Sequence, residues 1–266
     1  MSMETVSKLA EGGSGKAEFL ETNPLGFWIS SMMAGIYVGF GILLIFSLGS
    51  VLDPSVRPLV MGGAFGLALI LVVFAGADLF TGHTMSMTFS FLERRSSAGA
   101  VASVWVTSWL GNLAGALLLA ALFVAGGGGL ITKAPSEFIY TAAAAKMNMD
   151  ALPLIARAIL CNWLVCLALW MSARVANEAA RMVAIAWCLF AFIATGFEHS
   201  VANMTLFGVA LLSEHPETVT WTGMAWNLTW VTLGNTIAGA VFMAVAYWLA
   251  AGRQLLPAIA QADPAE

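Results

Sequence analysis

Six long apolar stretches alternate along the chain with short polar or turn-rich links. An α-helix needs roughly 20 residues to cross the ~30 Å hydrocarbon core of a bilayer, and every stretch is at least that long. They lie at about 27–50, 59–92, 100–125, 153–174, 182–212 and 222–251. The pattern predicts an all-α integral membrane protein, with six transmembrane helices in one domain over residues 1–266. An even number of crossings places both termini on one side.

The second and fifth stretches are too long for a single crossing. A helix of about 30 residues extends ~45 Å, well beyond the apolar core. Each of the two stretches also carries polar residues near its middle, at 78–83 and at 198–203. Irregular backbone at membrane depth is tolerated only where it is buried in protein or lines a cavity. We therefore expect helices 2 and 5 to be broken at the midplane, around a pathway.

A short internal repeat supports this plan. The sequence LGNLAGA at 110–116 is echoed by LGNTIAGA at 233–240, in the third and sixth stretches. If spans 1–3 and 4–6 are repeats, the odd number of crossings in each gives the halves opposite orientations. This is the inverted 3+3 arrangement, in which broken helices surround a substrate site at the midplane.

Composition agrees with a membrane location. The chain is 60% hydrophobic and 10% charged, against roughly 25% charged residues in a soluble domain. With a net charge of −4 and no basic stripe, nucleic acid is not an expected partner. The first 26 residues are polar and show no signal-peptide pattern. They are predicted to be a cytoplasmic segment, as is the tail at 252–266.

Basic residues decide the orientation, because positive charges are retained on the cytoplasmic face. With the N-terminus inside, seven basic residues are internal and four are external. The internal ones are Lys8, Lys16, Arg94, Arg95, Arg174, Arg181 and Arg253, and the external ones are Arg57, Lys133, Lys146 and Arg157. The distribution predicts cytoplasmic termini.

No metal or cofactor site is predicted. The three cysteines, at 161, 166 and 188, lie in apolar segments with no zinc or redox spacing. The three histidines, at 83, 199 and 215, are scattered. Because no haem, flavin, metal or nucleophile constellation is visible, an enzyme is disfavoured.

Several motifs resemble those of one transporter family. They are FEHSVANM at 197–204, Leu79-Phe80-Thr81, Asn162 within CNWLVCLALWMS, and Leu233-Gly234-Asn235. Over nearly the whole chain the sequence resembles the formate/nitrite transporter family, and DLFTGHTM at 78–85 is more similar to its nitrite branch than to its formate branch. The resemblance implies an aquaporin-like protomer, a homopentamer in the bacterial inner membrane, and one anion pathway through each protomer.

The same resemblance implies roles for individual residues. It assigns an outer apolar constriction to Phe65, Leu69 and Phe192, an inner one to Leu79 and Phe80, and the space between them to His199 facing Thr81, with Asn162 and Asn235 as polar wall groups. Lys146 would lie in the outer half of the pathway and attract anions.

His199 carries the main functional hypothesis. Desolvating a small anion costs several kcal/mol, so a pathway must neutralise or compensate its charge. An imidazole can change charge in the physiological pH range. A protonated His199 would pair with nitrite or formate, or transfer a proton to it, before the next apolar constriction. The alternatives are a structural hydrogen bond to Thr81 only, a proton-coupled symporter, a channel chiefly for formate, or a neutral-solute channel.

The neighbours of this histidine are expected to be structural. Glu198 points ~100° away from His199 on a helix, toward another helix or subunit. Asp78 is expected to anchor the break before Leu79. Asn112 and Asn235 are candidates for satisfying backbone groups that the breaks expose, although the resemblance favours Asn235 as a pathway residue.

Overall fold

A computed structural model describes residues 2–133 and 137–252, and all regular structure within them is helical. In chain order the helices are α1 (Met3–Thr22), α2 (Pro24–Val51), α3 (Arg57–Ala75), α4 (Phe80–Leu92), α5 (Ala98–Ala125), α6 (Phe138–Met147), α7 (Ala151–Arg174), α8 (Glu178–Ala194), α9 (Ser200–Leu211), α10 (Trp221–Ile237), the π-helical segment η1 (Ala238–Val245) and α11 (Ala246–Ala250). The all-α prediction is confirmed for these residues. The predicted tail, with Arg253, lies outside them apart from Gly252.

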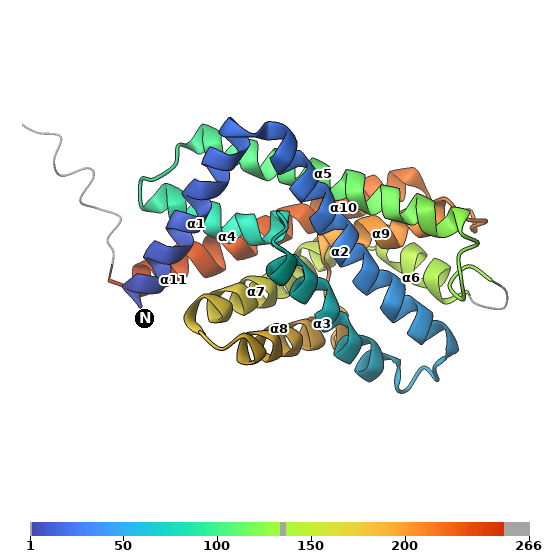
Figure 1. The fold of residues 1–266 in the computed structure, drawn as a ribbon. Helices are drawn as coiled ribbons and strands as arrows, with labels where there is room; N and C mark the ends of the chain where they lie inside the picture. The colour runs from blue at the N-terminus through green and yellow to red at the C-terminus, as the bar shows by residue number, and fades with distance from the viewer. Residues whose placement is uncertain (1, 134–136, 253–266) are drawn as a thin grey trace, which may run out of the picture.

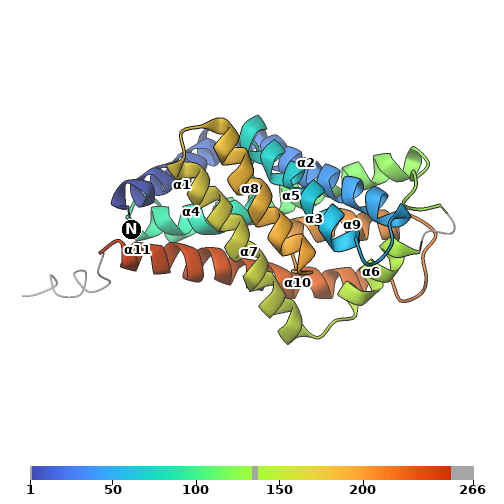
Figure 2. The same cartoon turned by 90° about the horizontal axis from the view of Figure 1, so that it is seen from below.

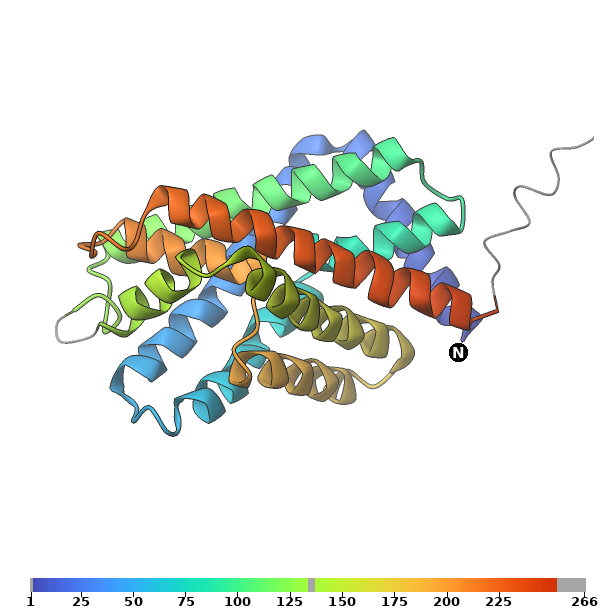
Figure 3. The same ribbon diagram turned by 180° about the vertical axis from the view of Figure 1, so that it is seen from behind.

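In the described part of the chain, five helices are long and apolar enough to cross a membrane. They are α2, α3, α5, α7 and the continuous rod of α10, η1 and α11, which runs the length of the molecule in Figure 3. The stretch predicted at 182–212 is divided between α8 and α9, and each of these is shorter than a full crossing. The stretch at 59–92 is likewise divided, into α3 and α4.

The helices form an elongated bundle whose links gather at its two ends. The N-terminus, the last described residues and the links at 93–97 and 175–177 lie at the left in Figure 1, and the links at 52–56 and 212–220 lie at the right. The short helices α4 and α9 start near the middle and run toward opposite ends (Figure 1). α7 and α8 form an antiparallel hairpin (Figure 2).

Glycines allow the closest crossings between helices, as at Gly35 and Gly115. A Cβ on Gly35 would collide with the carbonyl of Asn112, and a Cβ on Gly115 with that of Met32. The α2–α5 contact is therefore made backbone to backbone. In the other half of the chain, a Cβ on Gly234 would come within 2.6 Å of the carbonyl oxygen of Ile155, so α10 and α7 cross in the same way.

The polar N-terminal segment is a helix, which its composition does not suggest. α1 packs across α4 (Figure 1), with Val6 and Ala10 fully buried. A Cβ on Gly13 would collide with the carbonyl of Ser86 in α4. The helix is therefore stabilised by packing on α4 rather than by its own hydrophobicity. This brings Lys8 and Lys16 close to the interior of the bundle.

Candidate functional site

The two interruptions are built alike. α3 ends at Gly76, with φ 76°, and α8 is followed by Gly196, with φ 73°. Both glycines are in the left-handed region, which residues with a Cβ rarely adopt. Two residues later, the Asp78 N–H donates to the carbonyl of Ser30 at 3.3 Å. The Glu198 N–H donates to the carbonyl of Arg157 at the same distance. Each chain segment then starts a short helix.

Asn112 holds the first interruption in place. This fully buried side chain accepts a hydrogen bond from the Phe80 N–H at 2.9 Å through Oδ1. Its Nδ2 donates to the carbonyls of Ser31, at 2.7 Å, and Asp78, at 2.9 Å. One amide thereby pairs with the first N–H of α4, with a carbonyl in the link before it and with a carbonyl inside α2.

Asn235 does the same at the second interruption. Its Oδ1 accepts from the Ser200 N–H at 2.9 Å, and its Nδ2 donates to the carbonyls of Ala158, at 2.9 Å, and Glu198, at 3.1 Å. The prediction that Asn112 and Asn235 satisfy exposed backbone groups is confirmed. The Leu-Gly-Asn sequence that occurs in both α5 and α10 supplies the two asparagines that make these matching hydrogen bonds.

His199 caps the second short helix. Its Nδ1 lies 3.2 Å from the Ala202 nitrogen and accepts that N–H. Its Nε2 lies 3.2 Å from Thr81 Oγ1, and the ring stacks on Phe192 with 6.0 Å between centroids. Because Nδ1 acts as an acceptor, a neutral ring carries its proton on Nε2 and donates it toward Thr81. His199 therefore links the starts of α4 and α9.

A very small cavity adjoins this histidine. Its volume is about 10 Å³, and its lining includes His199, Phe192, Leu69, Leu79, Val38 and Val165. A single water needs roughly 10–15 Å³, so this space cannot hold an ion together with its hydration shell. Phe192 also meets Phe65 edge to face, with 5.5 Å between centroids, and both rings are buried. An anion passing here would have to lose its water.

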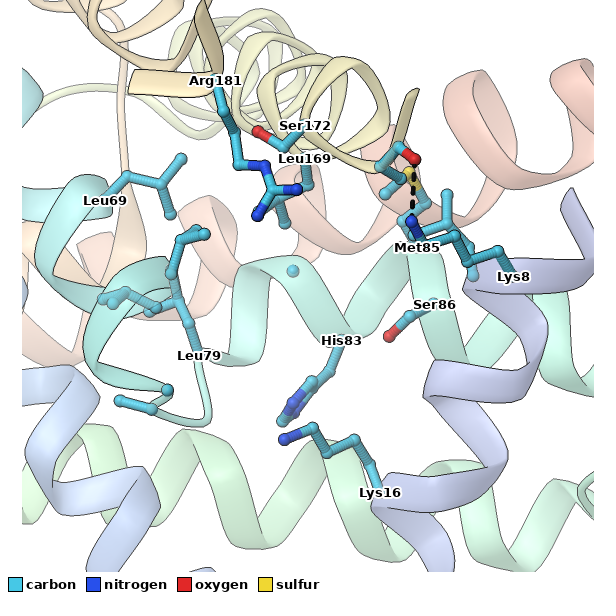
Figure 4. Close-up of a pocket in the computed structure, with 17 residues that line it drawn as sticks. Lys8, Lys16, Leu69, Leu79, His83, Met85, Ser86, Leu169, Ser172 and Arg181 are labelled. Carbon is cyan, nitrogen blue, oxygen red and sulfur yellow. Dashed lines mark hydrogen bonds between the residues drawn. The ribbon is translucent and has the colours of Figure 1, made fainter. Parts of the chain in front are cut away.

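A much larger cavity of about 370 Å³ lies on the side of the N-terminal helix (Figure 4). Leu69 and Leu79 border both this cavity and the small one, so these two leucines separate them. Leu69 is thus placed beside Leu79 as well as near Phe192, whereas the sequence assigned it to the outer constriction only. Basic groups of Lys8, Lys16, His83 and Arg181 line the larger cavity.

Asn162 is a buried connector. Its Nδ2 donates to the Thr81 carbonyl at 3.3 Å, to Thr84 Oγ1 at 3.0 Å and to the Asn235 carbonyl at 2.6 Å. It does not line the small cavity, and neither does Asn235. Asn162 fixes the backbone of Thr81, the residue that faces His199.

Lys146 and Glu198 belong to one closed network. Lys146 Nζ lies 2.6 Å from Glu198 Oε1, and Asn203 Nδ2 donates to Glu198 Oε2 at 2.7 Å. Asn203 also donates to Asn227 Oδ1 at 2.9 Å, and Asn227 Nδ2 donates to the Lys146 carbonyl at 3.0 Å. The structural role expected of Glu198 is confirmed. Lys146, expected as a pathway charge, has a carboxylate partner.

Lys146→Met is expected to lower the free energy of unfolding by about 3 kcal/mol, because it leaves a buried carboxylate without its cation. Glu198 is 1% exposed, so water cannot replace the ammonium group. Adding Glu198→Gln should restore most of the loss. The unfolding temperature in detergent measures both effects. An equal loss in the single and the double variant would show that the charge pair is not the cause.

Lys16 and Asp78 form the corresponding pair at the first interruption, which the sequence did not reveal. Lys16 Nζ lies 2.7 Å from Asp78 Oδ1, Ser30 Oγ donates to Asp78 Oδ2 at 2.6 Å, and His83 Nε2 lies 3.2 Å from Oδ1. One signal was available. A carboxylate at membrane depth needs a cation, and the polar N-terminal segment contains two lysines, Lys8 and Lys16.

Comparisons with known proteins agree with the family that the sequence motifs resemble. The family profile described as formate/nitrite transporter matches residues 3–249. Nitrite transporter NirC of Escherichia coli (strain K12) is 51% identical over 250 residues, which are 94% of this chain and 92% of that protein. A solved structure titled FNT family ion channel is 50% identical with a TM-score of 0.91, covering 94% of this chain and 99% of that one. A structure titled "Pentameric formate channel with formate bound" is 26% identical with a TM-score of 0.71, covering 86% and 97%.

Proposed function

Because this chain belongs to the formate/nitrite transporter family, whose members are transporters and channels rather than enzymes, we propose that it is a membrane channel for small monovalent anions, chiefly nitrite. The observation that carries the proposal is the cavity of about 10 Å³ between Phe192, His199 and the leucines. It is too small for a hydrated ion and has a hydrogen-bond donor at its wall. The 51% identity to a nitrite transporter, against 26% to a formate channel, favours nitrite.

The proposed architecture is an aquaporin-like protomer of six spans in an inverted 3+3 repeat. Here α3 with α4 and α8 with α9 are the two broken spans. The matched hydrogen bonds of Asn112 and Asn235 support this pairing of halves. The charge distribution supports cytoplasmic termini in a bacterial inner membrane. A homopentamer is supported by the solved relative that is titled pentameric.

The proposed route passes from Lys146 to the constriction of Phe65, Leu69 and Phe192, and then to His199 opposite Thr81. It continues past Leu79 and Phe80 into the larger cavity. Asn162 and Asn235 contribute by holding the wall that carries Thr81 and His199. Lys146 attracts anions less strongly than a free lysine would, because Glu198 neutralises it at 2.6 Å.

The hydrogen bonds of His199 define two ways of assisting an anion. With Nδ1 accepting from Ala202, the neutral ring keeps one proton, on Nε2, and this N–H can turn from Thr81 to the anion. Giving up that proton outright first requires a second proton on Nδ1, which would break the bond to Ala202. Charge-neutral hydrogen bonding is therefore the resting mode, and protonation of the anion requires a change at the start of α9.

Reconstitution into bilayers, with nitrite, formate and chloride compared across pH, tests the function. We expect nitrite conductance to exceed that of formate, with chloride far below both. A nitrite gradient at equal pH should drive current without stoichiometric proton movement. Fixed stoichiometry would establish the proton-coupled symporter instead, and formate conductance above that of nitrite would establish a formate channel. Equal conductance of chloride would contradict the proposed selectivity.

A further inference from the structure

The larger cavity has an unusual charge balance. Among the described residues that line it, three are basic, Lys8, Lys16 and Arg181, a fourth is His83, and none is Asp or Glu. Its volume of about 370 Å³ is far above the ~10–15 Å³ that one water needs, so it accommodates an anion with part of its hydration shell. It meets the small cavity at Leu69 and Leu79.

The basic groups fall into two pairs. Lys16 and His83 both contact Asp78 Oδ1, at 2.7 and 3.2 Å, so the carboxylate compensates the charge of Lys16. Lys8 and Arg181 have only backbone partners in the described part of the chain. Lys8 Nζ donates to the Ala173 carbonyl and Arg181 Nη2 to the Val175 carbonyl, each at 3.1 Å. Uncompensated positive charge therefore enters this cavity from α1 and from α8.

Some guanidinium N–H donors of Arg181 are not used by the described part of the chain. Its Nη2 is used by Val175, and its buried Nε has no hydrogen-bond partner among the residues that the structure describes. Figure 4 shows its guanidinium group reaching into the cavity from α8, with Lys8 approaching from α1. A guanidinium group is planar and presents paired N–H donors, which match an anion that carries two oxygens on one atom. A spherical halide cannot use both donors in this way.

We propose that Arg181, assisted by Lys8, forms an anion-binding site in this cavity. The site holds a planar two-oxygen anion such as nitrite next to the leucine restriction and favours it over chloride. The inference rests on the proposed function and extends it, because it places part of the selectivity in the cavity rather than at His199. Arg181 provides geometry and charge, and Lys8 provides charge alone.

Three variants separate these contributions in planar bilayers, with anion added from the cavity side. Arg181→Gln removes both the positive charge and the paired N–H donors of the guanidinium group. It should raise the half-saturating nitrite concentration about 3- to 10-fold, as expected for a charged hydrogen bond in a partly hydrated site. Arg181→Lys keeps the charge, and should lower the preference for nitrite over chloride while chloride conductance is retained. Lys8→Gln should raise the half-saturating concentrations of both anions about twofold at low salt and have little effect at 1 M, where the Debye length is about 3 Å.

Arg95→Gln is the matched control, because Arg95 is an exposed arginine at the same end of the molecule that does not line the cavity. It should leave all three quantities unchanged. Wild-type values in both Arg181 variants, in protein that conducts nitrite normally, would overturn the cavity site and leave the channel function intact. Wild-type protein that conducts no nitrite would overturn the channel function, and with it the site.

Discussion

His199→Asn is expected to reduce nitrite flux at least about tenfold, which corresponds to the loss of ~1.4 kcal/mol of stabilisation at the narrowest point. Asn is a good N-cap, so it can replace Nδ1 as acceptor of the Ala202 N–H and keep the start of α9 folded. Its side chain is too short to restore the contact with Thr81 Oγ1, which is 3.2 Å from Nε2. The dehydrated anion would then pass without the Nε2–H donor of the histidine.

The pH dependence of this variant is as informative as its rate. Asn does not titrate, so any contribution of His199 to the pH profile of nitrite flux should vanish. His215→Asn is the matched control, since His215 lies in the exposed link at 212–220. Flux and pH profile equal to those of the wild type would remove His199 from the mechanism. A lower flux with an unchanged pH profile would leave it as a hydrogen-bond donor only.

Thr81→Val tests whether the partner of His199 shares this role. Removing the hydroxyl leaves Nε2–H without its acceptor, but it leaves the donor itself in the cavity wall. If His199 donates to the anion, nitrite flux in Thr81→Val should fall less than in His199→Asn. The reverse order of effects would assign the main contact with the anion to Thr81.

The sequence predicted the positions of both interruptions because two physical signals coincide there. The stretches are too long for one crossing, and the residues from Asp78 and from Glu198 onward are polar where hydrocarbon would surround them. Neither signal exists for α1 or α6. α1 is polar and depends on packing against α4, and α6 is only 10 residues long. Local sequence does not record such tertiary stabilisation.

The contacts around the carboxylates show a second limit. The sequence indicated that Glu198 is structural, but not that Lys146, 52 residues away, pairs with it. It likewise gave no link between Asp78 and Lys16. Long flexible side chains can reach many positions, so their partners depend on how α1 and α6 pack. The roles of the asparagines were easier to predict, because the repeated Leu-Gly-Asn marks Asn112 and Asn235 as a matched pair, and each bonds the backbone at one of the two interruptions.

Asn235→Ala is expected to destabilise the protein severely. It leaves the Ser200 N–H and the Glu198 carbonyl without the partner they have at 2.9 and 3.1 Å, and it removes a second hydrogen bond, at 2.9 Å, from the Ala158 carbonyl within α7. Asn235 is fully buried, so water cannot easily replace the amide. At ~1–3 kcal/mol for each unsatisfied group, the loss of several kcal/mol approaches the whole stability of a typical domain, about 5–15 kcal/mol. The yield of monodisperse protein and its unfolding temperature in detergent measure it.

Asn112→Ala provides the parallel test, because it removes the same set of bonds from the first interruption. If Asn112 and Asn235 stabilise the two interruptions in the same way, the two variants should lose similar amounts of stability. A pathway role for Asn235 predicts a different result, namely normal stability with altered nitrite flux and no such effect for Asn112. Thr229→Ala, on the exposed side of α10, controls for loss of a polar side chain from that helix. A structural hydrogen-bonding role of Asn235 affects stability, whereas contact with the anion affects flux. Unfolding temperature and flux, measured together, therefore assign Asn235 to one of these two roles.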